Sequence, residues 1–306
     1  MVVQHNLTAM NSNRMLGITT STQAKSTEKL SSGYKVNRAA DDAAGLSISE
    51  KMRRQVRGLT QASLNAQDGI SCVQTAEGAL AEVQDMLQRM NELCVKAANG
   101  TLQTIDRNYV QQEINALTSE IDRVASTTTF NETNLLDGTF VQKDLHVGAE
   151  GSKNWNGGAA ATLQSGQTIR VQIAKMSFFG VTCSNDEVRA YVEDPAAAIP
   201  TGGISTLAVS TQELAQSSIA VVKTAIKNVS TMRSALGAIQ NRLEHTIKNL
   251  DNVVENTTAA ESQIRDTDMA TEMVRYSNNN ILAQAGQSML AQANQANQGV
   301  LSLLGR

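Results

Sequence analysis

The feature that most constrains the fold is the placement of proline. Both prolines of the 306-residue chain, Pro195 and Pro200, lie in its central part. Because proline breaks the interior of a helix, residues 1–140 and 205–306 are free to form long uninterrupted helices. The central part also contains glycine-rich stretches, at 155–158 and 201–203. We therefore expect two helical arms that flank a segment of different character.

Apolar and small residues recur every three or four positions along both arms. In the first arm this stripe predicts one long helix that stops at Asn99-Gly100, and a second helix at about 109–124. The later arm repeats the pattern from Val222 to Thr257. The stripe of the first helix comprises Met52, Val56, Leu59, Ser63, Ala66, Ile70, Val73, Ala76, Leu80, Val83, Leu87, Met90, Cys94 and Ala97. Three striped helices predict a mainly α fold, a long antiparallel helical bundle or coiled coil.

Two stretches between the arms have a β-like pattern. Residues 139–147 and 167–173 partly alternate polar with apolar or β-branched residues, and glycine-rich turns lie around them. We expect a small β-hairpin region inserted between the arms. It is too short to build a large core of its own.

The extreme ends are almost without charge. Residues 1–24 carry only Arg14, and residues 277–305 carry no charged side chain. Such segments bury too little surface alone to offset the entropy lost on ordering. We expect these ends to be disordered in the monomer and helical in an assembly.

Composition and motifs argue against an enzyme. Aromatic residues make up only 3% of the chain, and the formal net charge is −3, which gives no general reason to bind nucleic acid. The zinc, nucleophile-elbow and phosphate-loop motifs are absent from the sequence, so we expect no catalytic site, metal or cofactor. Asp41 and Asp42 are interpreted as helix-start charges. The basic cluster at 51–57 allows two readings, nucleic-acid contact or a helix face between subunits, and the lack of aromatic residues favours the second.

The three cysteines do not form a disulfide framework. Cys72 and Cys94 would lie roughly 33 Å apart along one helix, too far for a bridge. We expect Cys94 to pack in the core and Cys183 to be an exposed thiol. The N-terminus lacks the pattern of a secretory signal, and no apolar run is long enough to span a bilayer, which predicts a soluble chain.

Several strings resemble those of one family. Residues 30–33 (Leu-Ser-Ser-Gly) and 37–46 (Asn-Arg-Ala-Ala-Asp-Asp-Ala-Ala-Gly-Leu) resemble the N-terminal signature of bacterial flagellin. Residues 130–138 resemble the end of its second helix, and 261–272 and 290–295 resemble its C-terminal strings. The resemblance covers nearly all of both arms, in order. It departs from the family at Cys94, at Ala296-Asn297, where proline is frequent, and at Gly305.

The resemblance implies a structural subunit of the flagellar filament that assembles with copies of itself for motility. Residues 1–43 with 264–306 would form a terminal filament-core domain, and 44–182 with 207–263 a rod domain that includes the hairpins. Residues 183–206 would be a short surface insert. It also implies secretion through the flagellar type III apparatus without a cleaved signal, and contacts with an export chaperone, the filament cap and hook-junction proteins.

Two sets of site residues follow from the same resemblance. Gln88, Arg89, Leu93 and Glu113 match the flagellin surface that vertebrate Toll-like receptor 5 reads. The alternative is contact with the next subunit, and both roles can hold because the family's receptor surface overlaps its assembly surface. Leu290, Val300, Leu301, Leu303 and Leu304 match residues of the filament core that the export chaperone covers and that cytosolic innate sensors read.

Two rival functions remain at this point. A hook–filament junction protein has similar ends but a divergent centre and does not form long filaments. A zinc- or nucleotide-dependent enzyme would need the motifs that the sequence lacks.

Overall fold

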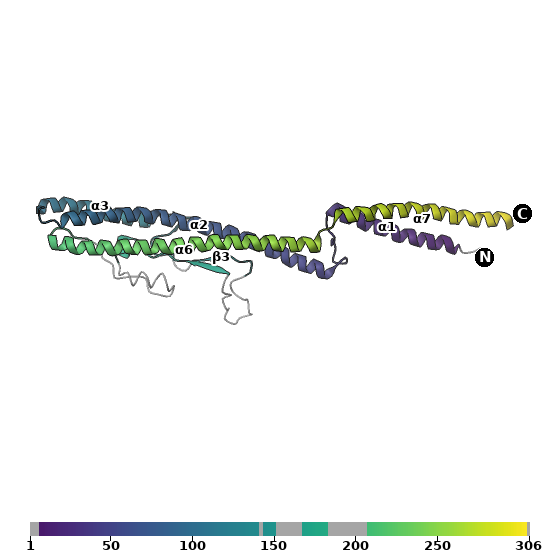
Figure 1. The fold of residues 1–306 in the computed structure, drawn as a ribbon, viewed down its shortest axis with the longest axis horizontal. Helices are drawn as coiled ribbons and strands as arrows, with labels where there is room; N and C mark the ends of the chain where they lie inside the picture. The colour runs from purple at the N-terminus through teal and green to yellow at the C-terminus, as the bar shows by residue number, and fades with distance from the viewer. Residues whose placement is uncertain (1–5, 141–142, 151–166, 183–206, 305–306) are drawn as a thin grey trace, which may run out of the picture. The chain divides into compact units, whose positions relative to one another are not determined.

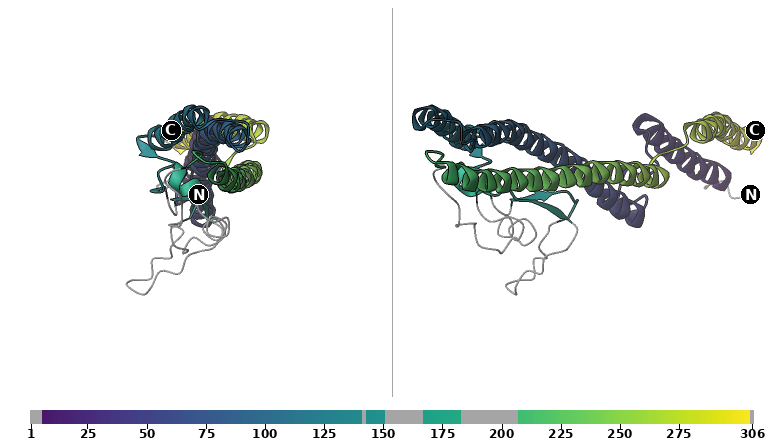
Figure 2. Two further views of the ribbon diagram at one scale, coloured as in Figure 1. Left: turned by 90° about the vertical axis from the view of Figure 1, so that its left-hand side faces the viewer. Right: turned by 60° about the vertical axis from the view of Figure 1, so that its left-hand side comes forward.

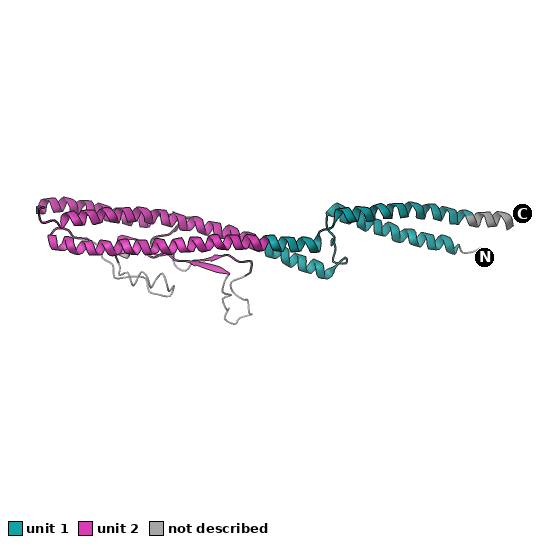
Figure 3. Ribbon diagram, viewed as in Figure 1, with its two compact units in different colours: residues 1–56, 255–306 teal, residues 57–254 magenta. Residues whose placement is uncertain are grey.

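The computed structural model describes residues 6–140, 143–150, 167–182 and 207–304. The chain divides into two compact units (Figure 3): unit 1 comprises 1–56 and 255–306, and unit 2 comprises 57–254. The long helices α2 (Ala43–Ala97) and α6 (Gln212–Arg265) contribute residues to both units. The sequence-based domain boundaries at 43/44 and 263/264 fall near the ends of these two helices, and they stay a prediction.

Unit 1 is built around two helices from opposite ends of the chain, α1 (Leu7–Ser32) and α7 (Met269–Leu304), which pack along each other (Figure 1). The Asn6 side chain caps α1 by accepting from the Ala9 amide at 3.0 Å, and Gly33 ends it in the left-handed conformation, φ 76°. Asp268 caps α7 by accepting from the amides of Ala270 and Thr271. Residues 7–32 and 269–304 are therefore helical in this structure, with local caps and mutual packing. The expected disorder of these ends in the dilute monomer stays a prediction.

Few side chains are buried in unit 1. Among its described residues they are Ser26, Val36, Ser49, Glu272 and Ala283. Three of these five are polar or charged, so the pair α1 and α7 gains little from the hydrophobic effect.

Unit 2 contains the main core, where α2, α3 (Thr104–Thr127) and α6 lie side by side (Figures 1 and 2). Each helix supplies side chains that are fully buried, such as Leu87 from α2, Ile114 from α3 and Leu236 from α6. From Leu59 onward the predicted stripe of α2 is buried except at Ile70, which is partly exposed. The mainly α, antiparallel helical fold is thus confirmed.

The predicted β-hairpin region is also present. Strands β3 (Lys143–His146) and β4 (Thr168–Val171) pair antiparallel, with Leu145 opposite Ile169. Val147 and Ile169 pack against Ala66 of α2 and Leu243 of α6, which places the hairpin on the helices. The short pair β1 (Thr129–Phe130) and β2 (Thr133–Asn134) was not expected from the sequence. Its turn places Asn131 and Glu132 at positive φ, 47° and 62°.

The chain on either side of the insert closes one side of the core. Phe178 in the short helix α4 (Phe178–Val181) is 1% exposed, and its amide donates to the Asp122 carboxylate at 2.8 Å. The Gln111 amide accepts from the Val209 nitrogen and donates to the Leu207 carbonyl, both at 2.7 Å. These main-chain partners hold both flanks of the insert on α3. Cys183 and the insert at 183–206 lie outside the described residues.

Candidate functional site

Unit 1 exposes a large apolar surface on α1 and α7. Ile281 of α7 is 62% exposed, and large apolar side chains are exposed along both helices. They are Leu7, Met10, Met15 and Ile18 on α1, and Met269, Met273, Val274, Ile281, Leu282 and Met289 on α7. The same two helices carry few charges. Exposed large apolar side chains at this density along two helices favour contact with a partner.

The five predicted filament-core residues lie on helix α7. Leu290 is half-buried on α7. Val300, Leu301, Leu303 and Leu304 belong to the same helix, but their side chains lie outside the described part of the structure.

The two connections within unit 1 are clasped together. The Lys35 amide donates to the Arg265 carbonyl at 2.6 Å, and the Thr267 amide donates to the Gly33 carbonyl at 3.0 Å. The Arg265 guanidinium lies 4.5 Å from the centre of the Tyr34 ring and 3.3 Å from a Glu50 oxygen. The α1–α2 connection is thereby joined to the α6–α7 connection, which sequence reasoning did not predict.

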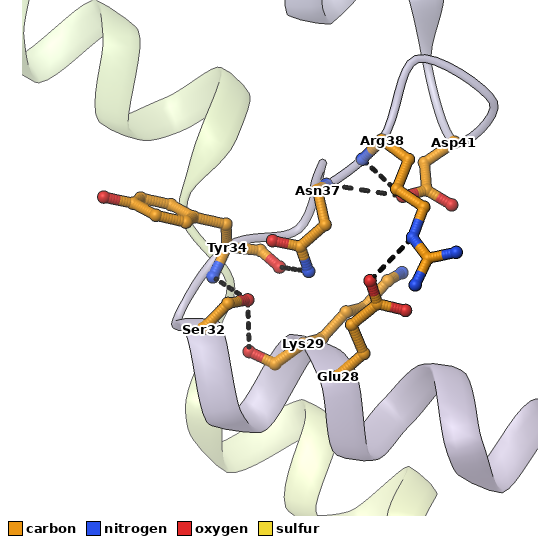
Figure 4. A network of polar contacts seen from close by, with 7 residues as sticks. All are labelled: Glu28, Lys29, Ser32, Tyr34, Asn37, Arg38 and Asp41. Atoms are coloured by element: carbon orange, nitrogen blue, oxygen red, sulfur yellow. Dashed lines mark hydrogen bonds and ion pairs between the residues drawn. The ribbon is translucent and has the colours of Figure 1, made fainter.

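Figure 4 shows the polar network that shapes the α1–α2 connection. Glu28 pairs with Arg38 at 2.9 Å, and the Asp41 carboxylate accepts from the amides of Asn37 and Arg38. These contacts lower the pKa of Asp41, chiefly through the hydrogen bond from the Arg38 amide. Asp42 accepts from the Gly45 amide at 2.9 Å and so caps α2. Asp42 thus has the helix-start role that the sequence predicted, whereas Asp41 shapes the connection that precedes α2.

In unit 2 the structure brings together residues of the predicted receptor surface from two helices. Arg89 of α2 pairs with Glu113 of α3 at 2.9 Å and with Glu92 at 3.1 Å. Hydrogen bonds to Glu113, and secondly to Glu92, raise the pKa of Arg89. Gln88 is exposed beside this pair. Leu93, in contrast, is 2% exposed and packs in the core, so it supports the surface from below.

An open hollow of about 390 Å³ adjoins this surface. It is lined by Lys96, Leu102, Asp106, Tyr109, Val110 and Glu113. Tyr109 is 65% exposed, and Ile105 on the same helix is 62% exposed. Apolar side chains thus lie beside both acidic and basic groups, a mixture that occurs at the rims of protein interfaces.

The cysteines of unit 2 are buried thiols. Cys94 is fully buried and Cys72 nearly so. Burial raises the pKa of Cys94 to about 11 and also raises that of Cys72. Core packing is thus confirmed for Cys94. In the described part of the chain, no group of three or more His, Cys, Asp or Glu side chains is placed to hold a metal ion.

Comparison with known proteins identifies the family. A model of the bacterial flagellin N-terminal helical region matches residues 3–141, and one of the C-terminal helical region matches residues 219–304. A flagellin of Halalkalibacterium halodurans is 48% identical over 304 residues, covering 99% of this chain and 100% of that protein. The chain belongs to the bacterial flagellin family.

A second flagellin and one solved structure are also similar to this chain. A flagellin of Bacillus subtilis is 47% identical over 311 residues, covering 99% of this chain and 100% of that protein. A solved structure described as a candidate flagellar hook-associated protein of Vibrio parahaemolyticus has a TM-score of 0.52 at 15% identity. It covers 74% of this chain and 100% of that chain, and shows shared fold alone.

Membership of the family defines the general function. The chain is a structural subunit of the flagellar filament, which forms by self-assembly, and it is not an enzyme. Neither of the two flagellin relatives favours the hook–filament junction alternative. None of the described helices combines the length and the hydrophobicity that a bilayer crossing requires.

Proposed function

We propose that the subunit polymerises through the apolar surface of α1 and α7. The observation that carries this proposal is the concentration of exposed large apolar side chains on these two helices. Burying each such side chain contributes about 1.5–3 kcal/mol, and the scarcity of charge means that little ionic hydration is lost. Head-to-tail contacts between different surfaces do not close on themselves, so they produce an open helical filament.

A matched pair of variants tests this assembly surface. Ile281→Asp places a charge on the exposed face of α7, and Leu64→Asp places one at a similarly exposed apolar position of α2 in unit 2. Growth on filament seeds, followed by light scattering and electron microscopy, is expected to stop for Ile281→Asp and to continue for Leu64→Asp. Equal growth of the two variants would contradict the proposal.

The same surface explains a need for protection before assembly. We infer that the export chaperone covers Leu290, Val300, Leu301, Leu303 and Leu304, and that the chain leaves through the flagellar type III apparatus without a cleaved signal. The filament cap and hook-junction proteins would then contact the same ends. Replacing Leu301, Leu303 and Leu304 by Ser in the full chain is expected to abolish chaperone binding in calorimetry. Unchanged binding would exclude this segment.

We propose vertebrate Toll-like receptor 5 as a second partner, at Gln88, Arg89 and Glu113 with Leu93 beneath them. The supporting observation is that Arg89 is exposed yet held in one position by two carboxylates. A preorganised arginine loses little side-chain entropy on binding and is a frequent anchor of interfaces. The resemblance also gives this surface a role in assembly, so the receptor would read the free subunit.

Arg123 provides the matched control for this contact. It is an exposed arginine of the same unit, paired with Glu120 one turn away. Arg89→Ala is expected to weaken binding of the monomer to the receptor ectodomain by about tenfold or more, and Arg123→Ala to leave it unchanged. Surface plasmon resonance measures both. A loss of less than about twofold for Arg89→Ala would remove the proposal.

A further inference from the structure

The turn between α2 and α3 contains an exposed Asn-Gly pair, Asn99-Gly100. Helix α2 ends at Ala97, close to the stop that the sequence predicted at this pair, but Gly100 is not in the left-handed conformation that often ends a helix. The end of α2 is capped instead by Arg107 of α3. Its Nε donates to the Ala97 carbonyl at 3.0 Å and a terminal nitrogen donates to the Asn99 carbonyl at 3.1 Å.

The turn contains the groups needed for attack of a main-chain amide nitrogen, that of Gly100, on the side-chain amide of Asn99. The Gly100 amide has no hydrogen-bond acceptor among the described residues, unlike the amides inside the helices. Glycine also lacks the Cβ that would hinder attack by its nitrogen. The Thr101 amide donates to Asn99 Oδ1 at 3.3 Å, where negative charge develops when the side-chain amide is attacked.

We propose that Asn99 is a site of spontaneous deamidation, and that Arg107 directs the product toward isoaspartate. The Gly100 nitrogen bonds to Asn99 Cγ, and the Cγ–Nδ2 bond breaks. Ammonia leaves with the proton of the Gly100 amide, and a succinimide ring remains. Water then adds to one ring carbonyl and breaks its bond to the Gly100 nitrogen. Attack at Cγ yields aspartate, whereas attack at the main-chain carbon of residue 99 yields isoaspartate. No oxidant or reductant is required.

Arg107 distinguishes the two ring carbonyls. Its guanidinium already donates to the main-chain oxygen of Asn99, so it stabilises the oxyanion formed by attack at that carbon. The competing carbonyl has the neutral Thr101 amide at 3.3 Å. A charged donor is the stronger of the two. In isoaspartate the former main-chain carbonyl is a free carboxylate, which then pairs with Arg107.

The modification changes a surface of unit 2. It adds one negative charge close in sequence to Asp106 in the first turn of α3, and it lengthens the main chain between α2 and α3 by one methylene. The inference rests on the turn alone and does not depend on the proposed assembly or receptor contacts.

Peptide mapping of the full chain tests the proposal. The folded protein is held at pH 8 and 37 °C and digested at intervals with trypsin under mildly acidic conditions. The fragment 97–107 is then assayed for the mass change and for isoaspartate with an isoaspartyl methyltransferase. A fragment-level assay is needed because the chain has a second Asn-Gly pair at 156–157. We expect deamidation of Asn99 at a rate within about tenfold of the free peptide 97–107, and a higher isoaspartate fraction than that peptide shows.

Two variants separate the steps. Gly100→Ala is tolerated by the fold because the nearest atoms to the new Cβ are those of Gln212 at 3.8 Å. It is expected to slow the reaction about tenfold, equivalent to about 1.4 kcal/mol. Arg107→Met removes one trypsin site, so it is assayed on the longer fragment 97–123, and it should reduce the isoaspartate fraction to that of the peptide. Arg107→Lys, which keeps the charge and the cleavage site, should retain part of the bias. Circular dichroism checks that each variant is folded. The proposal is overturned if Asn99 stays intact while the peptide reacts, or if the folded chain and the peptide give the same product ratio.

Discussion

The two units of the chain use similar helices for opposite purposes. Unit 2 buries a continuous apolar core between α2, α3, α6 and the hairpin region, whereas unit 1 buries few side chains and exposes its apolar residues (Figure 3). Both contain long, proline-free helices, so helix formation does not distinguish them. What differs is where the apolar side chains find their partners: within one subunit in unit 2, and, on our proposal, between subunits in unit 1.

Hydrogen exchange is expected to show the largest difference. Amides of α1 and α7 have little buried surface to protect them, so their opening free energy should be close to zero in the dilute monomer. Those of α2 around Leu87 should approach the global value, about 5–15 kcal/mol. Mass spectrometry of exchanged peptides measures both. Equal protection of α7 and α2 would break the comparison, and protection of α7 on polymerisation would sharpen it.

Two leucine-to-alanine substitutions compare the units directly. Leu87 is fully buried, so Leu87→Ala should lower the free energy of unfolding by about 2–5 kcal/mol through lost contacts and a cavity. Leu282 is 58% exposed, so Leu282→Ala should change it by no more than about 0.5 kcal/mol. Urea unfolding followed by circular dichroism gives both values. A large effect of Leu282→Ala on the monomer would mean that α7 has a core of its own.

Alkaline pH should act on unit 2 through Cys94. Its pKa in the folded chain is about 11, raised by burial from 9.0, so the folded state keeps the proton longer than the unfolded state. The contribution of Cys94 to stability is therefore complete below pH 9 and is lost as pH rises toward about 11, by roughly 2 kcal/mol. Comparing unfolding at pH 8 and 10.5 in the parent and in Cys94→Ala isolates this contribution. The same slope in both proteins would assign it to other groups.

The clasp of unit 1, meaning the contacts that join the α1–α2 connection to the α6–α7 connection, should give the smallest effect when one contact is removed. Tyr34→Leu removes the aromatic ring from Arg265 but retains an apolar side chain, and an exposed cation–π contact contributes about 0.5–1 kcal/mol. Exchange of amides near Gly33 and Thr267 should rise, while unit 2 should be unaffected. Tyr34→Phe, which keeps the ring, is the control. Faster exchange in α3 would show that the clasp is not local.

The periodicity of the chain was sufficient to predict the helices and much of the core. The stripe through Leu80 and Leu87 identified the buried face of α2, because burial on one side repeats with the helical period. It did not include Ala62, Cys72 or Leu93, since a helix that contacts two helices and a hairpin buries a wider face than a two-helix seam. The strands β3 and β4 were predicted by alternation, which is also a local pattern.

Other features of the structure could not be predicted because no local sequence pattern encodes them. The β1–β2 turn depends on Asn131 and Glu132 at positive φ, and the clamps of Gln111 and Arg107 join side chains to main-chain groups of other segments. Neither clamp follows from a spacing in the sequence.

The sequence by itself determined that proline-free arms form long helices, that one face of each is apolar, and that the ends are nearly neutral. Only the tertiary structure decided which of those apolar faces is buried within the subunit. It paired Arg89 with Glu113 across two helices, buried Leu93 and left Ile281 exposed. The physical reason is that a helical period encodes a face, whereas the partner of that face depends on residues far away in the chain.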